Sequence, residues 1–145
     1  MNSLPIQALT PDAFAPFGTV IDWSEALERT GQSFHVVLRS PEPTGWRLAA
    51  QKVTARAAHA LANHPDTEEL FAPIQGRCVL LVALRGPFDE ASVAAFLLDR
   101  PACVARGVWH ASLALSEAAT VLIAENLEVS SERAELSRAL SASLV

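Results

Sequence analysis

Two short stretches of the chain hold most of the residues that could carry out chemistry. Residues 64–69 (HPDTEE) begin with His64 and end with Glu69, and Gly76 follows seven positions later. Residues 106–110 (RGVWH) form the second stretch. Imidazole titrates near neutral pH, and imidazole and carboxylate groups are common ligands of divalent metals. These residue types indicate acid–base catalysis or a metal site if the fold brings the two stretches together.

The spacing within the first stretch resembles the first motif of the cupin superfamily. That motif reads H-x-H-x(3,4)-E-x(6)-G, and the chain matches it at His64, Glu69 and Gly76. Ala62 stands where the motif has its first histidine. The plainer interpretation is that His64 helps to fix a turn and that Glu69 is a solvated strand residue.

The second stretch resembles the second cupin motif, which contains G-x(2)-H, here Gly107 to His110. Ala114 occupies the position where that motif usually has asparagine. The resemblance implies a small β-barrel in which two hairpins bring histidine and carboxylate side chains into the barrel mouth. His64, Glu69 and His110 would then form a two-histidine, one-carboxylate triad for a divalent metal such as nickel, manganese, zinc or iron.

Three blocks of sequence resemble one family more closely, the ureidoglycolate lyases, formerly called ureidoglycolate hydrolases. They are residues 9–21 (LTPDAFAPFGTVI), residues 64–76, with their His-Pro and Phe-x-Pro-x-x-Gly patterns, and residues 108–110 (VWH). The blocks occur in the family's order along most of residues 9–125. The resemblance implies a cytoplasmic enzyme of allantoin degradation in purine catabolism, which splits ureidoglycolate into urea and glyoxylate.

Such a reaction needs a base, a group that helps the urea nitrogen to leave, and a donor for the substrate carboxylate. Within this resemblance, His64 or His110 would be the base. Glu69 would orient a histidine or share a metal. Arg106 would bind the carboxylate of a small-molecule substrate through two hydrogen bonds. Trp109 would form part of the pocket wall.

Two alternatives remain open. The family typically has Glu-Arg-His-Pro where this chain has Ala62 and Asn63 before His64 and Pro65. The loss of that charged pair favours a divergent cupin that acts on, or binds, another small carboxylate. The second alternative is a structural or regulatory dimer without catalysis, in which apolar side chains would fill the pocket.

Short apolar runs separated by proline and glycine indicate many short strands. Together with the motifs they predict a mainly β fold, a single cupin-like antiparallel β-barrel spanning residues 1–145 as one domain. Residues 78–84 are apolar on both faces, which predicts a central strand. His35 is expected to be a half-buried strand residue and His59 to be solvated. Strands are predicted over residues 18–22, 34–38, 46–54, 70–74, 78–84, 93–98, 104–110 and 120–125.

Short helices are predicted near both ends. Thr10 caps the first, and Ser24 caps a short turn over residues 25–29. The tail from Ser130 onward is predicted to be a C-terminal helix because leucines recur every four residues, at Leu136, Leu140 and Leu144. Residues 55–63 are rich in alanine and favour a helix by propensity, but their position between strands argues against one.

Composition excludes several classes of protein. Half of the 145 residues are hydrophobic and 19% are charged, which excludes a disordered chain. The net charge is −5 and the ten arginines are scattered, so we expect no nucleic-acid partner. No apolar run approaches the roughly 18–20 residues of a membrane span, and no secretory signal is evident, so we expect no membrane partner and a cytoplasmic location.

Hydrophobic side chains also bear on assembly. The mean hydropathy of +0.24 is high for a monomer of this size and predicts a homodimer. Trp23 and Trp46 are expected to pack in the core or at an interface. Cys78 and Cys103 lie in apolar surroundings, which predicts two buried free thiols rather than a disulfide.

Overall fold

The computed structural model describes residues 2–144, which are mainly β. The helices of this region are α1 (Pro11–Phe14), α2 (Glu25–Glu28) and the short 3-10 helix η1 (Glu90–Ser92). Its strands are β1 (Asn2–Gln7), β2 (Gly18–Val20), β3 (Trp46–Val53), β4 (Ala58–Asn63), β5 (Glu69–Gln75), β6 (Cys78–Ala83), β7 (Ala94–Leu97), β8 (Ala102–Val104), β9 (Trp109–Ala114), β10 (Ala119–Asn126) and β11 (Glu132–Ser143).

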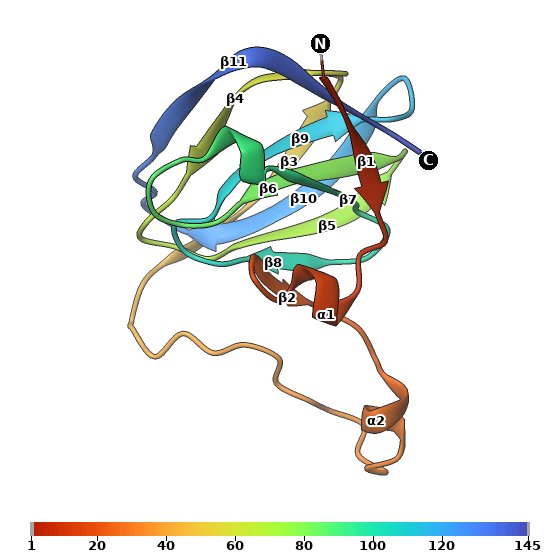
Figure 1. Cartoon of the computed structure of the whole chain (residues 1–145). Coiled ribbons are helices and arrows are strands. Elements are labelled where there is room, and N and C mark those ends of the chain that lie inside the picture. Colours follow the sequence, from red (N-terminus) through yellow and green to blue (C-terminus); the bar gives the residue numbers. More distant parts are fainter. Residues whose placement is uncertain (1, 145) are drawn as a thin grey trace.

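Two sheets form the body of the molecule. One closes into a six-stranded barrel in the order β1-β11-β4-β9-β6-β7, and the other has five strands in the order β2-β8-β5-β10-β3 (Figure 1). The predicted mainly β, cupin-like barrel is therefore confirmed. Its strands are not all antiparallel, because β1 runs parallel to both of its neighbours, β11 and β7.

The central strand β6 separates two hydrophobic interiors. All six of its residues are buried, which confirms the predicted central strand. Because successive side chains of a strand point to opposite faces, Leu80 and Val82 pack into the first interior, between the two sheets. Val79 and Leu81 pack into the second, which β1 and β11 help to enclose.

The predicted short helices near the N-terminus are confirmed, with the predicted caps. The Thr10 hydroxyl accepts a hydrogen bond from the Ala13 N–H at 3.2 Å, and Pro11 is the first helical residue of α1. The Ser24 hydroxyl accepts one from the Leu27 N–H at 3.2 Å at the start of α2. Each cap satisfies a backbone N–H that has no partner within its helix.

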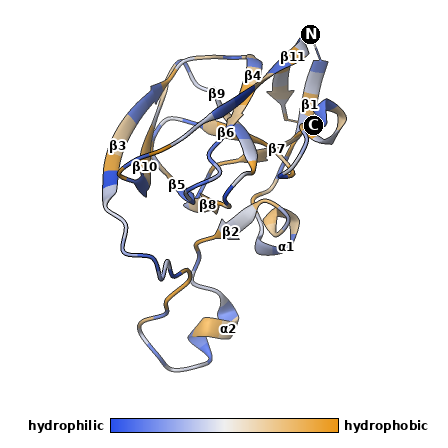
Figure 2. Ribbon diagram, turned by 90° about the vertical axis from the view of Figure 1, so that its left-hand side faces the viewer, coloured by the Kyte–Doolittle hydropathy of each residue, from blue (hydrophilic) through white to orange (hydrophobic). Residues whose placement is uncertain are grey.

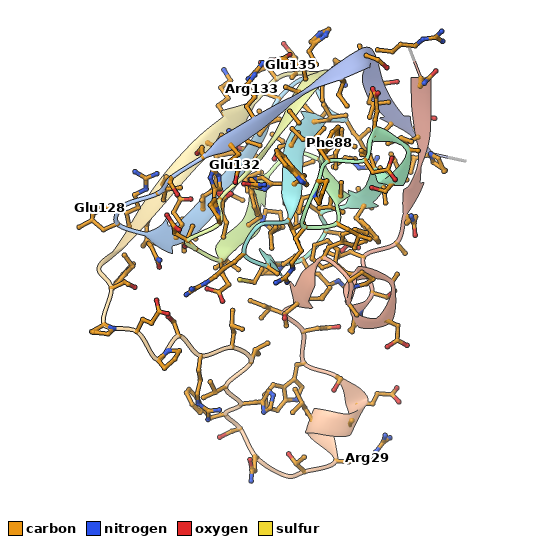
Figure 3. All side chains as sticks on the ribbon, turned by 60° about the vertical axis from the view of Figure 1, so that its left-hand side comes forward. Arg29, Phe88, Glu128, Glu132, Arg133 and Glu135 are labelled. Atoms are coloured by element: carbon orange, nitrogen blue, oxygen red, sulfur yellow. The ribbon has the colours of Figure 1, made fainter. Side chains whose placement is uncertain are left out.

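The predicted C-terminal helix is wrong, because residues 132–143 form the strand β11. A spacing of four residues suits one face of a helix but also, being even, one face of a strand. Leu136 and Leu140 pack into the second interior, where β11 pairs with β4 and β1. Glu132, Arg133 and Glu135 of this strand are exposed (Figure 3). Tertiary pairing thus decides between two periodicities that the sequence satisfies equally.

The alanine-rich segment also forms a strand, β4, as its position between strands indicated. Residues 2–7 form the strand β1, which the sequence did not predict. Cys78 and Cys103 are buried free thiols, as predicted.

The predicted strand over residues 34–38 is wrong. These residues are exposed and irregular, and His35 is exposed rather than half-buried. They belong to residues 21–45, here called the projecting segment, which extends away from both sheets and carries α2 (Figures 1 and 2). Trp23 and Trp46 are 44% and 69% exposed, so neither packs in the core.

No helix among residues 2–144 combines the length and the apolar character that crossing a lipid bilayer requires.

Candidate functional site

The site lies between the two sheets, and each sheet supplies part of it. His64 follows β4 directly and His110 lies on the neighbouring strand β9, where it pairs with Ala62. Glu69 is the first residue of β5 in the other sheet. The candidate ligand atoms of His64, Glu69 and His110 all lie within 4.8 Å of one another. Two sequence stretches about 40 residues apart thus meet at one place.

These three side chains line a cavity of about 220 Å³. The volume lies below the roughly 300–1,000 Å³ of pockets for drug-sized ligands, so it suits a small polar molecule. The wall combines imidazole, carboxylate, amide and hydroxyl groups with apolar side chains. The other lining residues are Gln51, Ala62, Phe71, Ala111, Ser112 and Ile123.

Backbone carbonyl groups orient both imidazole rings. His64 Nδ1 lies 3.2 Å from the Ser130 carbonyl oxygen, and His110 Nδ1 lies 3.1 Å from the Val108 carbonyl oxygen. A carbonyl oxygen only accepts hydrogen bonds, so each Nδ1 carries the proton and donates. Nε2 of each ring then faces Glu69; it carries a lone pair in the neutral ring and a proton in the imidazolium.

The Nε2 atoms of both histidines lie close to one carboxylate oxygen of Glu69. His110 Nε2 lies 2.8 Å from Glu69 Oε1, and His64 Nε2 lies 3.5 Å from the same oxygen. An unprotonated nitrogen and a carboxylate oxygen repel each other at 2.8 Å unless a proton or a cation lies between them. The donor set of two imidazole nitrogens and one carboxylate oxygen fits a divalent metal. His64, Glu69 and His110 thus form a possible metal-binding triad.

The carboxyl group of Glu69 responds to the same neighbours. Burial alone would raise its pKa, but the hydrogen bond and the charge of His110, with smaller effects of Glu125 and His64, hold the pKa below its ordinary value. Glu69 is therefore an anion at neutral pH, as a metal ligand or a partner of an imidazolium must be.

The structure adds two charged residues that sequence reasoning missed, Glu125 on β10 and Arg47 on β3. Arg47 donates to Glu125 Oε2 from Nε at 2.9 Å and from Nη2 at 2.7 Å. Burial and the nearby carboxylate of Glu69 raise the pKa of Glu125, an effect that Arg47 partly opposes. Alternation along residues 120–125 offered a signal, because Glu125 falls on the same face as the apolar Val121 and Ile123.

Two residues expected to bind substrate lie elsewhere. Arg106 Nε lies 3.3 Å from Glu68 Oε2, and its Nη1 lies 3.7 Å from Glu42 Oε1 in the projecting segment. The Trp109 indole donates to the Gly86 carbonyl oxygen at 3.0 Å, and Trp109 packs in the second interior. The structure brings neither side chain to the cavity wall that the triad lines.

The closed barrel, the second sheet and the histidine–carboxylate cluster between them are typical of a cupin-like protein. Within that class, the chain belongs to the ureidoglycolate lyase family, whose sequence profile matches residues 1–140. The ureidoglycolate lyase of Burkholderia mallei strain NCTC 10229 is 30% identical over 141 residues, which cover 86% of this chain and 83% of that protein. The protein of strain NCTC 10247 matches to the same extent.

Two solved structures are also similar. One is a dTDP sugar isomerase from Desulfovibrio desulfuricans G20, with a TM-score of 0.48 and 20% identity over 69% of this chain and 73% of that chain. The other is RmlC from Streptococcus suis in complex with dTDP-D-xylose, with a TM-score of 0.46 and 14% identity over 83% of this chain and 55% of that chain.

Proposed function

We propose that the protein is a ureidoglycolate lyase, which releases urea and glyoxylate from ureidoglycolate in allantoin degradation. The observation that carries the proposal is the convergence of His64, Glu69 and His110 on one small cavity in a chain of this family. The cavity size, the two oriented imidazoles and the buried carboxylate all suit proton transfer on a small polar acid.

In the proposed reaction the hydroxyl proton of the substrate moves to Nε2 of His110. The C–O bond becomes the carbonyl of glyoxylate, the C–N bond breaks, and its electron pair goes to the urea nitrogen. A proton from the imidazolium then completes urea, so the histidine returns to its neutral form. Glu69, whose Oε1 lies 2.8 Å from this nitrogen, stabilises the imidazolium between the two transfers.

His64 shares the carboxylate of Glu69 and faces the same space. Its Nδ1 is fixed by the Ser130 carbonyl and by the Ser131 hydroxyl at 2.9 Å, so its ring has one orientation. We propose that His64 assists His110 in this proton transfer, or holds a metal with it. If the triad held a divalent cation instead, with nickel, manganese, zinc and iron as candidates, that cation would supply a Lewis acid that lowers the pKa of the substrate hydroxyl.

One observation favours a different substrate. Ala62 and the buried Asn63 replace the charged pair that precedes the histidine in the family pattern, and the Oδ1 of Asn63 accepts no hydrogen bond from the described residues. A divergent member that acts on or binds another small carboxylate would use the same triad. A dimer without catalysis is the remaining alternative.

The first test is the release of urea and glyoxylate from racemic ureidoglycolate, by metal-stripped protein and by protein resupplied with each candidate metal. Release above the uncatalysed decay, lost in His110→Ala, supports the lyase. Absence of release under every condition overturns it and directs the search to other small carboxylates. Dependence on one metal, together with binding of that metal by the wild type and not by His64→Ala, would assign the triad as its ligands.

We also propose that the protein is a cytoplasmic homodimer. Large hydrophobic side chains are exposed on the projecting segment and on the outward face of the edge strand β3, including Phe34, Trp46 and Leu48. An unpaired edge strand with exposed apolar side chains is a common site of association. Light scattering during gel filtration should give twice the 15.5 kDa of one chain. A monomer at micromolar concentration would contradict this proposal.

A further inference from the structure

A row of charged side chains crosses the inner face of the five-stranded sheet beside the triad. On this face Phe71, Ile123 and Ala49 lie side by side on β5, β10 and β3, because Ile123 pairs with both of the others. Two residues further along β10 is Glu125, which pairs with Arg47. Since side chains two residues apart share a face, Glu69, Glu125 and Arg47 form the next row.

The contacts within this row leave part of each group unused. Both nitrogens of Arg47 that contact Glu125 reach the same oxygen, Oε2. The other oxygen, Oε1, is buried and accepts no hydrogen bond from residues 2–144. The Glu125 side chain is only 7% exposed, whereas that of Arg47 is 49% exposed. A guanidinium has five N–H groups, so Arg47 retains donors that Glu125 does not occupy.

We propose that Arg47 is the residue that binds the carboxylate of the substrate and that Glu125 positions it. This inference rests on the proposed function for the identity of the ligand. Gln51, which lies on the same face of β3 as Arg47, lines the cavity, and Glu125 contacts Glu69 of the triad. A guanidinium binds a carboxylate through two parallel hydrogen bonds. Ala49, which lies between Arg47 and Gln51 on this face, adds only a methyl group between them.

Charge balance supports the same assignment. Glu69 and Glu125 bring two carboxyl groups into a largely buried region, so an anionic substrate needs a cation nearby. Arg47 is the guanidinium that contacts Glu125 of this pair. Arg106 is held by Glu68 and Glu42 and would have to give up those contacts to serve.

The test compares two ligands that cannot be cleaved. Hydantoate has the ureido and carboxylate groups of ureidoglycolate but no hydroxyl group, and hydantoin-derived N-carbamoylglycinamide replaces its carboxylate with a neutral amide. Calorimetric titration of wild type, Arg47→Gln, Arg106→Gln and Arg100→Gln with each ligand measures how strongly each protein prefers the carboxylate. Arg100 is a matched control, because it is ion-paired with Asp22 and Asp99 away from the cavity.

The expected result is that wild type, Arg106→Gln and Arg100→Gln prefer hydantoate, and that Arg47→Gln loses roughly ten- to hundredfold of this preference, as for a hydrogen bond to a charged group. Arg47→Lys should recover part of it. Glu125→Gln should weaken hydantoate binding less than Arg47→Gln, because it loosens Arg47 without removing the charge. Arg47→Gln alone leaves the buried carboxyl group of Glu125 without its cation, which could impair folding. The double variant Arg47→Gln, Glu125→Gln removes that charge, so it should fold and show the same loss of preference for hydantoate.

An unchanged preference in Arg47→Gln, a loss in Arg106→Gln instead, or a wild type that does not prefer the carboxylate would each overturn the inference. Failure of the lyase proposal is distinguishable. A protein that prefers hydantoate through Arg47 but releases no urea from ureidoglycolate retains this carboxylate site and lacks the proposed reaction.

Discussion

Two groups of aromatic rings pack in the first interior, and they differ in what surrounds them. Around Phe96, the centroids of Phe14 and Phe17 lie at 5.2 and 5.7 Å, and the neighbouring side chains are apolar. Around His110, the centroids of His64 and Phe71 lie at 5.0 and 5.5 Å. Carboxyl groups adjoin this second group. Both groups use tilted or edge-to-face packing, so ring geometry alone does not separate them.

The difference lies in what burial does to each region. The phenylalanine region removes apolar surface from water and leaves no polar atom to satisfy, so it stabilises the fold. The histidine region buries Glu69, whose Oε1 lies 2.8 Å from His110 Nε2, and Glu125, whose Oε1 accepts no hydrogen bond from the described residues. Buried carboxyl groups cost free energy unless fully paired. We infer that the phenylalanine region stabilises the fold and that the histidine region retains its carboxyl groups for the chemistry of the site.

The sharpest test of this contrast is His110→Ala. Loss of an acid–base group typically lowers turnover by roughly 10²–10⁴-fold, so we expect urea release to fall by that range while the circular dichroism spectrum is unchanged. His59→Ala, on the exposed face of β4, should keep wild-type turnover. Unchanged turnover in His110→Ala would remove this residue from the mechanism.

In the phenylalanine region the effect should be on stability. Phe96 is about 1% exposed, and truncation of such a side chain to alanine typically costs about 3–5 kcal/mol, because it leaves a cavity. We therefore expect Phe96→Ala to lower the free energy of unfolding in urea by this amount, with normal turnover per folded molecule. Phe34→Ala, at an 80% exposed position, should change the monomer's stability by less than about 0.5 kcal/mol. Comparable losses in the two variants would contradict the contrast.

The two carboxyl groups of the histidine region should respond oppositely to acid. The pKa of Glu69 lies below its ordinary value, so its contribution to stability is complete above the unfolded-state pKa of about 4.3 and is lost as pH falls through the folded pKa. The pKa of Glu125 is raised, so its ionisation costs stability that protonation returns.

Stability curves of the metal-stripped protein measured between pH 3 and 7 would show this. Compared with wild type, the decline of stability in acid should be shallower in Glu69→Gln and steeper in Glu125→Gln. The same slope in all three proteins would show that the two carboxyl groups are not perturbed as described.

How far the fold could be predicted depended on the ambiguity of each pattern. The sequence predicts a central strand at residues 78–84, because a short segment that is apolar on both faces is typical of a strand covered on both sides. The C-terminal tail was predicted wrongly, because leucines spaced by four suit a helix and a strand equally. Only the pairing of β11 with β4 and β1 decides between the two. Residues 34–38 have strand-forming side chains but no neighbouring strand to pair with, which a local pattern cannot reveal.

The candidate site divides in the same way. His64, Glu69 and His110 were found because their spacing follows a known motif, and the structure places them together. Arg47 and Glu125 were missed, because their proximity depends on the register of β3 with β10, which no local pattern specifies. Arg106 was chosen for its nearness to His110 in sequence, although its side chain points to Glu68.

The smallest effect we predict concerns the two thiols, and it tests whether the histidine region opens to solvent. Burial raises the pKa of Cys78 to about 11, and burial together with the charges of Glu68 and Glu69 raises that of Cys103 to about 12. The thiolate is the reactive form, so neither cysteine of the native protein should react with a disulfide reagent at pH 8, and both should react in denaturant. Selective reaction of Cys103 in the native protein would show that β8, which pairs with β5 at Glu69, opens more readily than β6, where Cys78 lies.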